Sequence, residues 1–295
     1  MSAALLETHT PRRRRFRLRR MLTEAAAMAV GLLVLIWTLA PIYNMAMVSL
    51  LSHSNIFSAN VWPVQPTLHN FWVVFTEGYW YLDYFWHQFA NSVYLGAATV
   101  FFTLFIGSLA SFSIGRMRIR YGWVLSNAAL LTYVIPASFL AIPFYRIMQS
   151  YGLSNNLWSV IAAEVTFATP YAIFIFQQYA VSIPIELDEA ARIDGASPIQ
   201  IYLRLYLPLM APALVAVGTY ALLLAWNEYL YQFLLLSSKR SMTVPVALAQ
   251  FLNSDESPWN YMMATAIVYA IPPVAIYYVF RRRMSAGLTM GGVKG

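Results

Sequence analysis

The chain has 295 residues, of which 60% are hydrophobic and only 11% are charged, and its mean hydropathy is +0.57. This balance lies outside the range of ordinary soluble domains and predicts a membrane protein. The complete absence of cysteine excludes a disulfide framework, a thiolate metal site and a cysteine nucleophile.

The N-terminal region carries seven arginines in one run, RRRRFRLRR at residues 12–20, directly before an apolar stretch. The formal net charge of +7 alone would suggest nucleic acid. Because lysine and arginine resist translocation, we instead expect residues 1–24 to be a basic cytoplasmic arm. A twin-arginine export signal is the alternative, but the apolar stretch is too long for a signal core and no small-residue cleavage site follows it.

Six apolar stretches are long enough to cross a bilayer, since about 20 residues rising about 1.5 Å each span a hydrocarbon layer of about 30 Å. They are residues 25–51, 88–113, 122–148, 157–181, 208–236 and 259–280. Prolines interrupt several of them, which helices in lipid tolerate where neighbours satisfy the freed carbonyls. The predicted fold class is an all-α membrane protein with six transmembrane helices, in one domain over residues 25–281 with a tail at 282–295.

The basic residues orient these spans. Sixteen of the nineteen lie in the N-terminal arm, the 114–121 loop, the 182–207 loop and the C-terminal tail, which alternate consistently to one side. The other side has only Arg146, Lys239 and Arg240. Since cytoplasmic loops are enriched in lysine and arginine, both termini are expected in the cytoplasm.

The segment at residues 52–87 then lies outside, and it is rich in aromatic residues with no lysine or arginine. Tryptophan and tyrosine prefer the membrane interface, so we expect a short amphipathic element at the outer surface. A platform on which a ligand stacks is the alternative.

The cytoplasmic loop at 184–207 gathers an unusual number of acids for so apolar a chain. Four of the twelve acidic residues stand here, namely Glu186, Asp188, Glu189 and Asp194. Pro184 suits the first turn of a helix, whose N-terminal dipole favours the first three acids. Gly195 closes that helix, and SPIQ at 197–200 forms a capping box that opens the next. The loop is predicted to be two short helices around a glycine turn.

Both short helices carry an apolar stripe. The residues are Leu187, Ala190 and Ala191 on the first helix and Ile201, Tyr202 and Leu205 on the second. A stripe at helical spacing has to bury itself against something. The membrane surface, the protein's own helices and a partner protein all remain open on these residues alone.

The run EAARIDGASPIQIYLRLYLPLMAP resembles the cytoplasmic signature, the EAA motif, of permease subunits in binding-protein-dependent ABC importers. The matching residues are Glu189, Ala190, Ala191, Asp194, Gly195, Ala196, Leu207 and Pro208. The resemblance implies that the loop is a coupling helix pair that docks in a cleft of an ATP-hydrolysing subunit. It also implies that Glu189 faces a basic residue there.

Three further runs resemble the smaller permease subunit of maltose-type carbohydrate importers. They are NSVYLG at 91–96, AWNEYL at 225–230 and GLTMGGVKG at 287–295. By the same resemblance the tail is a second contact with the ATPase, through Gly291, Gly292 and Lys294. The alternative for the tail is a disordered end.

The implied function is an alternating-access permease subunit for a sugar or oligosaccharide, multi-pass in a bacterial inner membrane. The implied partners are a second homologous permease subunit, two ATP-binding subunits, an external solute-binding protein, the carbohydrate substrate and membrane lipid, with no nucleic acid. Alternatives are the same importer class with another solute, such as polyamine or phosphate, and a secondary transporter driven by an ion gradient. A membrane enzyme has no supporting constellation of residues.

If transport is driven by ATP, the ATP has to be bound by another polypeptide, because a phosphate-binding loop needs glycines before a lysine followed by serine or threonine. The only two lysines are followed by Arg240 and Gly295. We therefore expect no catalytic residue and no cofactor in this chain, with ATP and magnesium bound by the partner. The four histidines are scattered outside the spans, so no metal site is expected.

Two places within the spans are candidates for the transport pathway or its gate. Glu164 lies roughly 10 Å inside the fourth span by helical rise, and acids at such depth commonly mark pathways or proton relays. A structural role in locking helices together is the alternative for Glu164. The second place is the WNEY run, made of Trp226, Asn227, Glu228 and Tyr229.

Overall fold

The computed structural model describes residues 11–56, 60–63, 65–117, 119–253 and 258–289, and regular structure within these ranges is helical throughout. The longer helices are α1 (Pro11–Ser49), α3 (Phe85–Gly115), α5 (Ala137–Ser150), α6 (Leu157–Ala180), α10 (Ala211–Asn227) and α13 (Trp259–Thr289). The shorter ones are α2 (His69–Phe75), α4 (Gly122–Leu131), α7 (Glu186–Ile193), α8 (Pro198–Ile201), α9 (Leu207–Leu209), α11 (Leu230–Leu235) and α12 (Val244–Gln250).

The all-α membrane fold expected from the six apolar stretches is confirmed, with two of the spans broken. Four helical segments are long and apolar enough to cross a membrane unbroken: Arg20–Ser49, Phe85–Gly115, Leu157–Ala180 and Trp259–Arg281. Two helix pairs complete the six if each counts as one span, and they bend by 100° and 77°.

The first break lies between α4 and α5, where Ile135 is extended before Pro136. The residue before a proline is disfavoured in the α region, so the helix ends there and restarts in a new direction. The second break, at Met210, separates α9 from α10. The expected fifth stretch at 208–236 is also not one helix, because α10 ends at Asn227 and Glu228 is extended before α11 begins.

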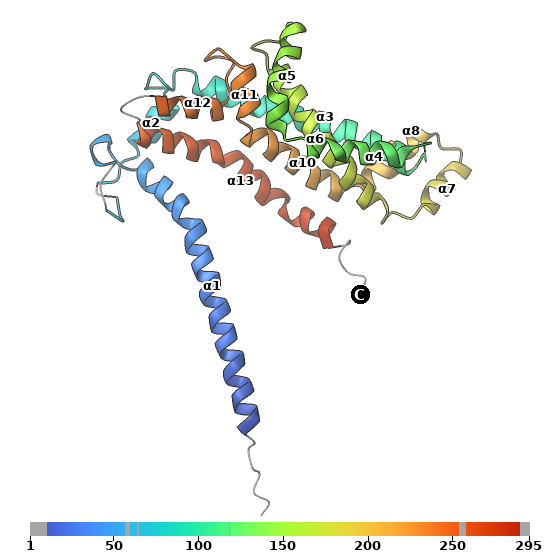
Figure 1. Ribbon diagram of the computed structural model, residues 1–295, viewed down its shortest axis with the longest axis horizontal. Helices are drawn as coiled ribbons and strands as arrows, with labels where there is room; N and C mark the ends of the chain where they lie inside the picture. The colour runs from blue at the N-terminus through green and yellow to red at the C-terminus, as the bar shows by residue number, and fades with distance from the viewer. Residues whose placement is uncertain (1–10, 57–59, 64, 118, 254–257, 290–295) are drawn as a thin grey trace, which may run out of the picture.

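Helices α3, α6, α10 and α13 form the body of the molecule (Figure 1). Small residues allow their close approach, as is common between helices in membranes. A Cβ atom on Gly96 would lie 2.9 Å from Leu222 Cδ1 of α10, and one on Gly107 would lie 2.9 Å from Ala172 Cβ of α6. These two glycines of α3 therefore fix how closely it packs against α10 and α6.

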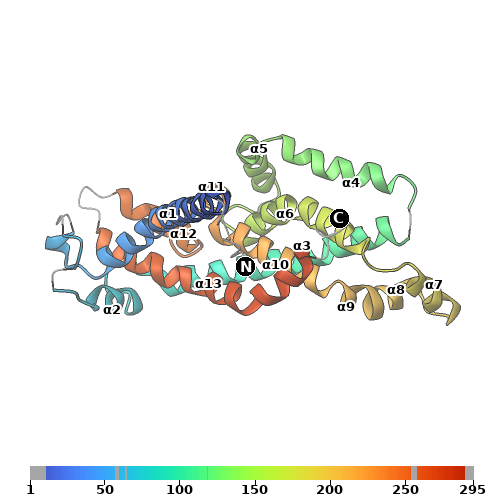
Figure 2. The same cartoon turned by 90° about the horizontal axis from the view of Figure 1, so that it is seen from below.

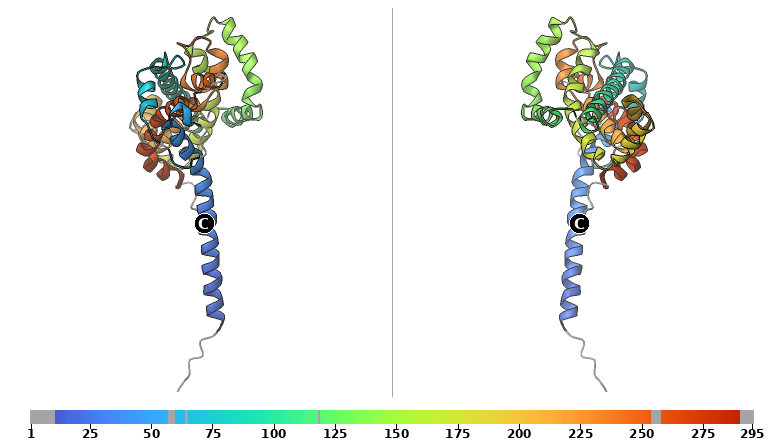
Figure 3. Two further views of the ribbon diagram at one scale, coloured as in Figure 1. Left: turned by 90° about the vertical axis from the view of Figure 1, so that its left-hand side faces the viewer. Right: turned by 90° about the vertical axis from the view of Figure 1, so that its right-hand side faces the viewer.

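Helix α1 leaves this body and extends away from it, as Figure 3 shows from two sides. The arm and the first apolar stretch form one continuous helix, and side chains from Arg20 to Asn44 are exposed throughout. Only the end of α1 is buried, where Asn70 of α2 donates hydrogen bonds to the carbonyls of Ser49 and Leu51, both at 2.8 Å. The long exposed length is apolar, as a lipid-facing helix requires.

The aromatic segment at 52–87 is only in part the surface element that its composition predicts. Trp72 of α2 is 66% exposed, but Val73 and Val74 on the same helix are buried in a cluster with Val268 of α13. Asn260 of α13 also donates a hydrogen bond to Asn70 Oδ1 at 2.9 Å. Composition alone missed these contacts because they involve partners nearly two hundred residues away.

The molecule is elongated, and its two ends differ in the segments that they carry. Helices α2 and α12 lie at one end of the body and α7 and α8 at the opposite end (Figures 1 and 2). This placement agrees with the alternation of charged loops, which assigns the 52–87 segment and the 184–207 loop to opposite sides of the membrane.

Candidate functional site

The 184–207 loop folds as its sequence predicts, into two short helices around a glycine turn. Helix α7 has all three early acids in its first turn. Gly195 has φ +83°, and the amide of Ala196 returns to the carbonyl of Ala191 at 2.9 Å. A residue in this left-handed region closes the helix and satisfies its last carbonyls. Only open space surrounds a Cβ at Gly195, so the backbone conformation alone requires glycine.

The second helix begins with the expected capping box. The main-chain amide of Gln200 donates to Ser197 Oγ at 3.4 Å, and the main-chain amide of Ser197 donates to Gln200 Oε1 at 2.7 Å. After α8 the chain widens into a π-helical turn at Tyr202–Tyr206 and continues through α9. The capping box fixes where the second helix starts, and the path from there to α10 is continuous apart from the bend at Met210.

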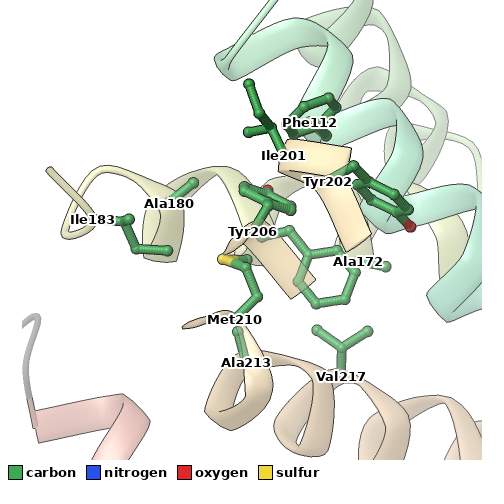
Figure 4. Packing of buried hydrophobic residues seen from close by; sticks show 11 residues of the cluster. Phe112, Ala172, Ala180, Ile183, Ile201, Tyr202, Tyr206, Met210, Ala213 and Val217 are labelled. Carbon is green, nitrogen blue, oxygen red and sulfur yellow. The ribbon is translucent and has the colours of Figure 1, made fainter. Parts of the chain in front are cut away.

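The apolar stripe of the second helix packs against the protein's own helices. Figure 4 shows Ile201, Tyr202 and Tyr206 packed with Phe112 of α3 and, further along, with Met210. All five side chains are buried. Two hydrogen bonds add to the packing, since the hydroxyls of Tyr202 and Tyr206 lie 2.7 Å and 3.1 Å from those of Ser108 and Ser111 on α3. Of the three open explanations for this stripe, burial within the chain is therefore the right one.

The first helix, by contrast, presents most of its surface to the outside. Ile193 is 87% exposed, and Glu189, Ala190, Asp194 and Gly195 are exposed as well. Ala191 and Ala196 are half-buried at the edge of the cluster of Figure 4, as is Leu207, while Pro208 is exposed. The eight signature residues thus divide into an outward set and a supporting set.

One buried ion pair holds α7 in place. Asp188 Oδ2 lies 3.4 Å from Arg116 Nη1, and both side chains are at least 95% buried. The same guanidinium donates to the carbonyls of Ala180 at 3.2 Å and Ile183 at 2.9 Å. Arg116 thus joins the end of α3, the end of α6 and the first turn of α7. A cation at the C-terminus of α6 also complements the helix dipole.

The acidic cluster of this loop therefore has two separate explanations. Asp188 faces inward and is paired with Arg116, although its Oδ2 accepts no hydrogen bond within the described residues, whereas Glu189 is exposed. Sequence reasoning did not single out Arg116, because it counted that residue only among the basic residues that orient the spans. The sequence did place Arg116 at the end of an apolar stretch, where a charged side chain can fold back and pair with an acid of the same protein.

Of the intramembrane candidates, the structure brings two together. Glu164 of α6 and Glu228, which follows α10, line one cavity between α5, α6, α10, α11 and the segment at 132–136 that joins α4 to α5. Glu228 accepts hydrogen bonds from the amides of Tyr231 at 2.8 Å and Gln232 at 3.1 Å, so its carboxylate caps α11. Glu164 is 1% exposed and its Oε1 has no hydrogen-bond partner within the described residues.

The other residues of the WNEY run lie outside this cavity. Trp226 is buried and stacks on Tyr269 of α13, with ring centroids 4.7 Å apart. Asn227 donates to the carbonyl of Leu223 at 2.8 Å, and Tyr229 stacks on Phe233. The run is therefore mainly a packing and helix-ending element from which Glu228 alone reaches the cavity.

Two expectations concern sites that the structure addresses only in part. Among the described residues, no group of three or more histidine, aspartate or glutamate side chains is placed to hold a metal ion. The tail residues Gly291, Gly292 and Lys294 lie outside the part of the chain that the structure describes.

Comparison with known families and proteins gives one consistent result. Residues 104–289 match the family model described as "Binding-protein-dependent transport system inner membrane component". The chain is 33% identical over 267 residues to the inner membrane ABC transporter permease protein YcjP of Escherichia coli, covering 89% of this chain and 94% of that protein.

The names of two further relatives state the substrate that they transport. The trehalose transport system permease protein SugB of Mycobacterium tuberculosis is 32% identical, over 89% of this chain and 95% of its own length. The arabinooligosaccharides transport system permease protein AraQ of Halalkalibacterium halodurans is also 32% identical, over 79% of this chain and 81% of its own length.

A solved structure shares the fold. It is a chain of a bacterial ABC transporter involved in the import of the acidic polysaccharide alginate, which superposes with a TM-score of 0.76 at 24% identity. The match covers 90% of this chain and 97% of that chain. At this identity the likeness establishes the arrangement of helices and nothing about cargo.

Proposed function

Since the chain belongs to the family of binding-protein-dependent transport system inner membrane components, and is therefore a permease subunit of an ABC importer, we propose that it carries a sugar or oligosaccharide. The subunit is a multi-pass inner membrane protein and is not itself an enzyme. Its family has no cofactor, and ATP is handled by a partner ATPase.

The main support for this mechanism is that one part of the coupling loop is bound to the protein's own helices, whereas the outward face of α7 is exposed. Arg116 and Asp188 bind α7 to the ends of α3 and α6, and α8 is buried against α3. Glu189 and Ile193 on the outward face have no such restraint. A partner that grips the outward face therefore moves α3, α6 and α10 together with the loop.

In this mechanism the ATPase pair closes on ATP and displaces α7, and the spans then open toward the docked binding protein. Hydrolysis resets the spans, which is alternating access. The complex contains a second homologous permease, two ATPase subunits and an external solute-binding protein, with both termini of this chain in the cytoplasm. The family name supports the binding protein, and the basic loops support the orientation.

The carbohydrate assignment is supported by the relatives whose names state trehalose and arabinooligosaccharides. The ion-gradient alternative has no support from any comparison. Polyamine and phosphate remain as competing cargo within the same importer class. A thermal-shift screen of the cognate binding protein against sugars, polyamines and phosphate distinguishes these cargoes, and stabilisation by a polyamine alone would overturn the sugar assignment.

The first test is isolation of the complex in mild detergent, with identification of the bound subunits by mass spectrometry and an ATPase assay. We expect a second permease and an ATPase with a phosphate-binding loop. A chain that is isolated alone, with uptake into vesicles that ignores ATP, would overturn the proposal. Removing residues 290–295 from the same complex tests the tail, and loss of ATPase stimulation is the expected result.

The second test reverses the charge of Glu189 on the outward face. Glu189→Lys should reduce ATP-driven uptake at least tenfold, because like charges replace an attraction across the interface at a cost of about 1.4 kcal/mol or more. Glu24→Lys is the matched control, since Glu24 is exposed on α1 and contacts only Arg20. Normal uptake by a stably inserted Glu189→Lys complex would exclude α7 as the coupling element.

A further inference from the structure

The cavity that holds Glu164 and Glu228 has features that coupling to an ATPase does not explain. Its volume is about 260 Å³, just below the range of about 300–1,000 Å³ typical of sites for drug-sized ligands. Its wall comes from four helices, α5, α6, α10 and α11, and from the segment at 132–136 that joins α4 to α5. The size suits a single sugar ring, and the broken span is the kind of irregular backbone that membrane proteins accept where it lines a cavity.

The described lining of this cavity has two carboxyl groups and no basic side chain. Glu164 Oε1 is buried without a hydrogen-bond partner among the described residues, and none of the described residues lining the cavity is lysine, arginine or histidine. Leaving a buried polar group unpaired costs about 1–3 kcal/mol. Buried carboxyl groups within membrane spans are accordingly rare and generally mark a functional position. Glu164 Oε1 is therefore open to a hydrogen-bond donor that the described residues do not supply.

Glu228 has remaining capacity in the same cavity. An ionised carboxylate has about four acceptor positions, and the amides of Tyr231 and Gln232 occupy two of them. These two bonds hold the carboxylate in a fixed place at the cavity wall. Both glutamates thus present acceptors to a ligand that brings hydroxyl or amino hydrogens.

Aromatic rings complete the wall. Tyr133, Phe167, Tyr220 and Tyr231 all line the cavity. The hydroxyl of Tyr231 is occupied by the carbonyl of Ala137 at 2.7 Å, so this side chain presents its ring and not its hydroxyl group. An apolar surface with a few fixed polar groups is the usual composition of a small-molecule site. Here the polar groups include two carboxyl groups that can accept hydrogen bonds, and aromatic rings form part of the apolar wall.

We propose that this cavity is a subsite for one non-acidic sugar unit of the translocated substrate, with Glu164 and Glu228 accepting hydrogen bonds from its hydroxyl groups. An acidic sugar would bring a further negative charge beside two carboxyl groups, and like charges without a cation are strongly disfavoured. The subsite therefore selects neutral or amino sugars against uronic acids. This inference rests on the proposed function and adds that the substrate contacts this subunit.

The chain's lack of cysteine makes the test direct, because one introduced thiol is the only one in this subunit. Leu224→Cys places a thiol in the cavity wall, and Thr132→Cys is a second position in the same wall. Ser154→Cys is the matched control, exposed between α5 and α6 and away from the cavity. The full importer with its binding protein is treated with a maleimide, and alkylation of this subunit is followed by mass spectrometry.

The probes are trehalose, diacetylchitobiose and arabinobiose, with digalacturonate as the acidic comparison. At least one non-acidic probe should slow alkylation of Leu224→Cys or Thr132→Cys severalfold and leave Ser154→Cys unchanged. Digalacturonate should protect neither cavity position. Adding Glu164→Leu, which removes the acceptor, should abolish the protection, whereas adding Glu24→Leu should not.

The subsite is refuted if a probe is taken up in an ATP-dependent manner and yet protects neither cavity cysteine. Protection that persists with Glu164→Leu, or that digalacturonate matches, also refutes it. Failure of the proposed function has a different signature, because then no sugar drives ATP-dependent uptake by the complex without introduced cysteines. If Glu164→Leu instead prevents the second permease from assembling, the carboxylate is an interface residue and the subsite assignment is wrong.

Discussion

Two buried carboxyl groups, Asp188 in the 184–207 loop and Glu164 in the cavity, differ in the charge beside them. Asp188 Oδ2 lies 3.4 Å from Arg116 Nη1, and that guanidinium also binds two main-chain carbonyls. The cavity of Glu164 has no basic side chain among its described lining residues. Neither Asp188 Oδ2 nor Glu164 Oε1 has a hydrogen-bond partner within the described residues, and the two side chains are almost equally buried, at 2% and 1% exposed. Burial alone therefore does not assign a role, because an acid with an ion-pair partner holds the fold and an acid without one is available to a ligand.

The largest expected effect comes from breaking the ion pair. Arg116→Met leaves Asp188 buried without its ion-pair partner and removes the side-chain donor to the Ile183 carbonyl, and removal of one partner of a buried pair costs about 3–5 kcal/mol. We expect loss of ATP-driven uptake and a lower melting temperature of the complex. Arg120→Met is the matched control, because Arg120 is exposed in the same loop.

A double variant sharpens this test. Arg116→Met with Asp188→Leu removes both charges, so it should recover part of the melting temperature that Arg116→Met loses. If the single and double variants lose the same stability, the ion pair contributes nothing and the comparison with Glu164 fails.

The second prediction concerns Glu164, the buried acid without an ion-pair partner. Glu164→Leu replaces a buried carboxyl group that has no partner by an apolar group of similar size, and should raise stability by roughly 1–3 kcal/mol. The melting temperature of the complex is the measurement, with Asp188→Leu as the contrasting variant that should lower it. A fall in melting temperature for Glu164→Leu would show that this carboxyl group, too, holds the fold.

The third prediction addresses the turn between the held and the free parts of the coupling loop. Gly195→Ala should lower the free energy of unfolding by about 1–2 kcal/mol. A Cβ disfavours the left-handed conformation at φ +83°, although no atom crowds it. Gly195→Asn should cost less, since asparagine adopts this conformation more readily. Uptake rates of the two variants should follow the same order, and equal losses would point to side-chain contact with a partner instead.

The smallest effect is expected at the start of the second helix. Ser197→Ala removes one of the two hydrogen bonds of the capping box. It should lower the free energy of unfolding by about 1 kcal/mol or less, since α8 is also held by packing. Ser197→Asp, which keeps a capping oxygen, should restore stability. Amide hydrogen exchange over residues 197–201 measures the effect locally, and a change spread over α7 would show that the two helices are one unit.

Much of the fold was predictable because its determinants are local. The length of the apolar stretches, the run of arginines at 12–20, the positive φ required at Gly195 and the capping box at 197–200 each depend on a few neighbouring residues. The family signature at 189–208 was predictable for the same reason.

The parts that sequence reasoning missed depend on distant partners. The contact of Arg116 with Asp188 crosses 72 positions, and the packing of α2 against α13 crosses nearly 200. The bends of 100° at Pro136 and 77° at Met210 were also missed, because a proline indicates where a helix ends but not the direction in which the next one continues. The joint cavity of Glu164 and Glu228 could not be derived either, because it requires knowing that α6 and the end of α10 lie side by side.

The 77° bend at Met210 sets the direction in which a force on this protein travels. Helices α8 and α9 form one arm of an elbow and α10 forms the other, so a push along the first arm has only a small component along the axis of the second. In the proposed mechanism, displacement of α7 therefore moves α10 mainly across its own axis and not along it. Such a motion changes the distance between α10 and its neighbouring helices and leaves its depth in the membrane nearly constant.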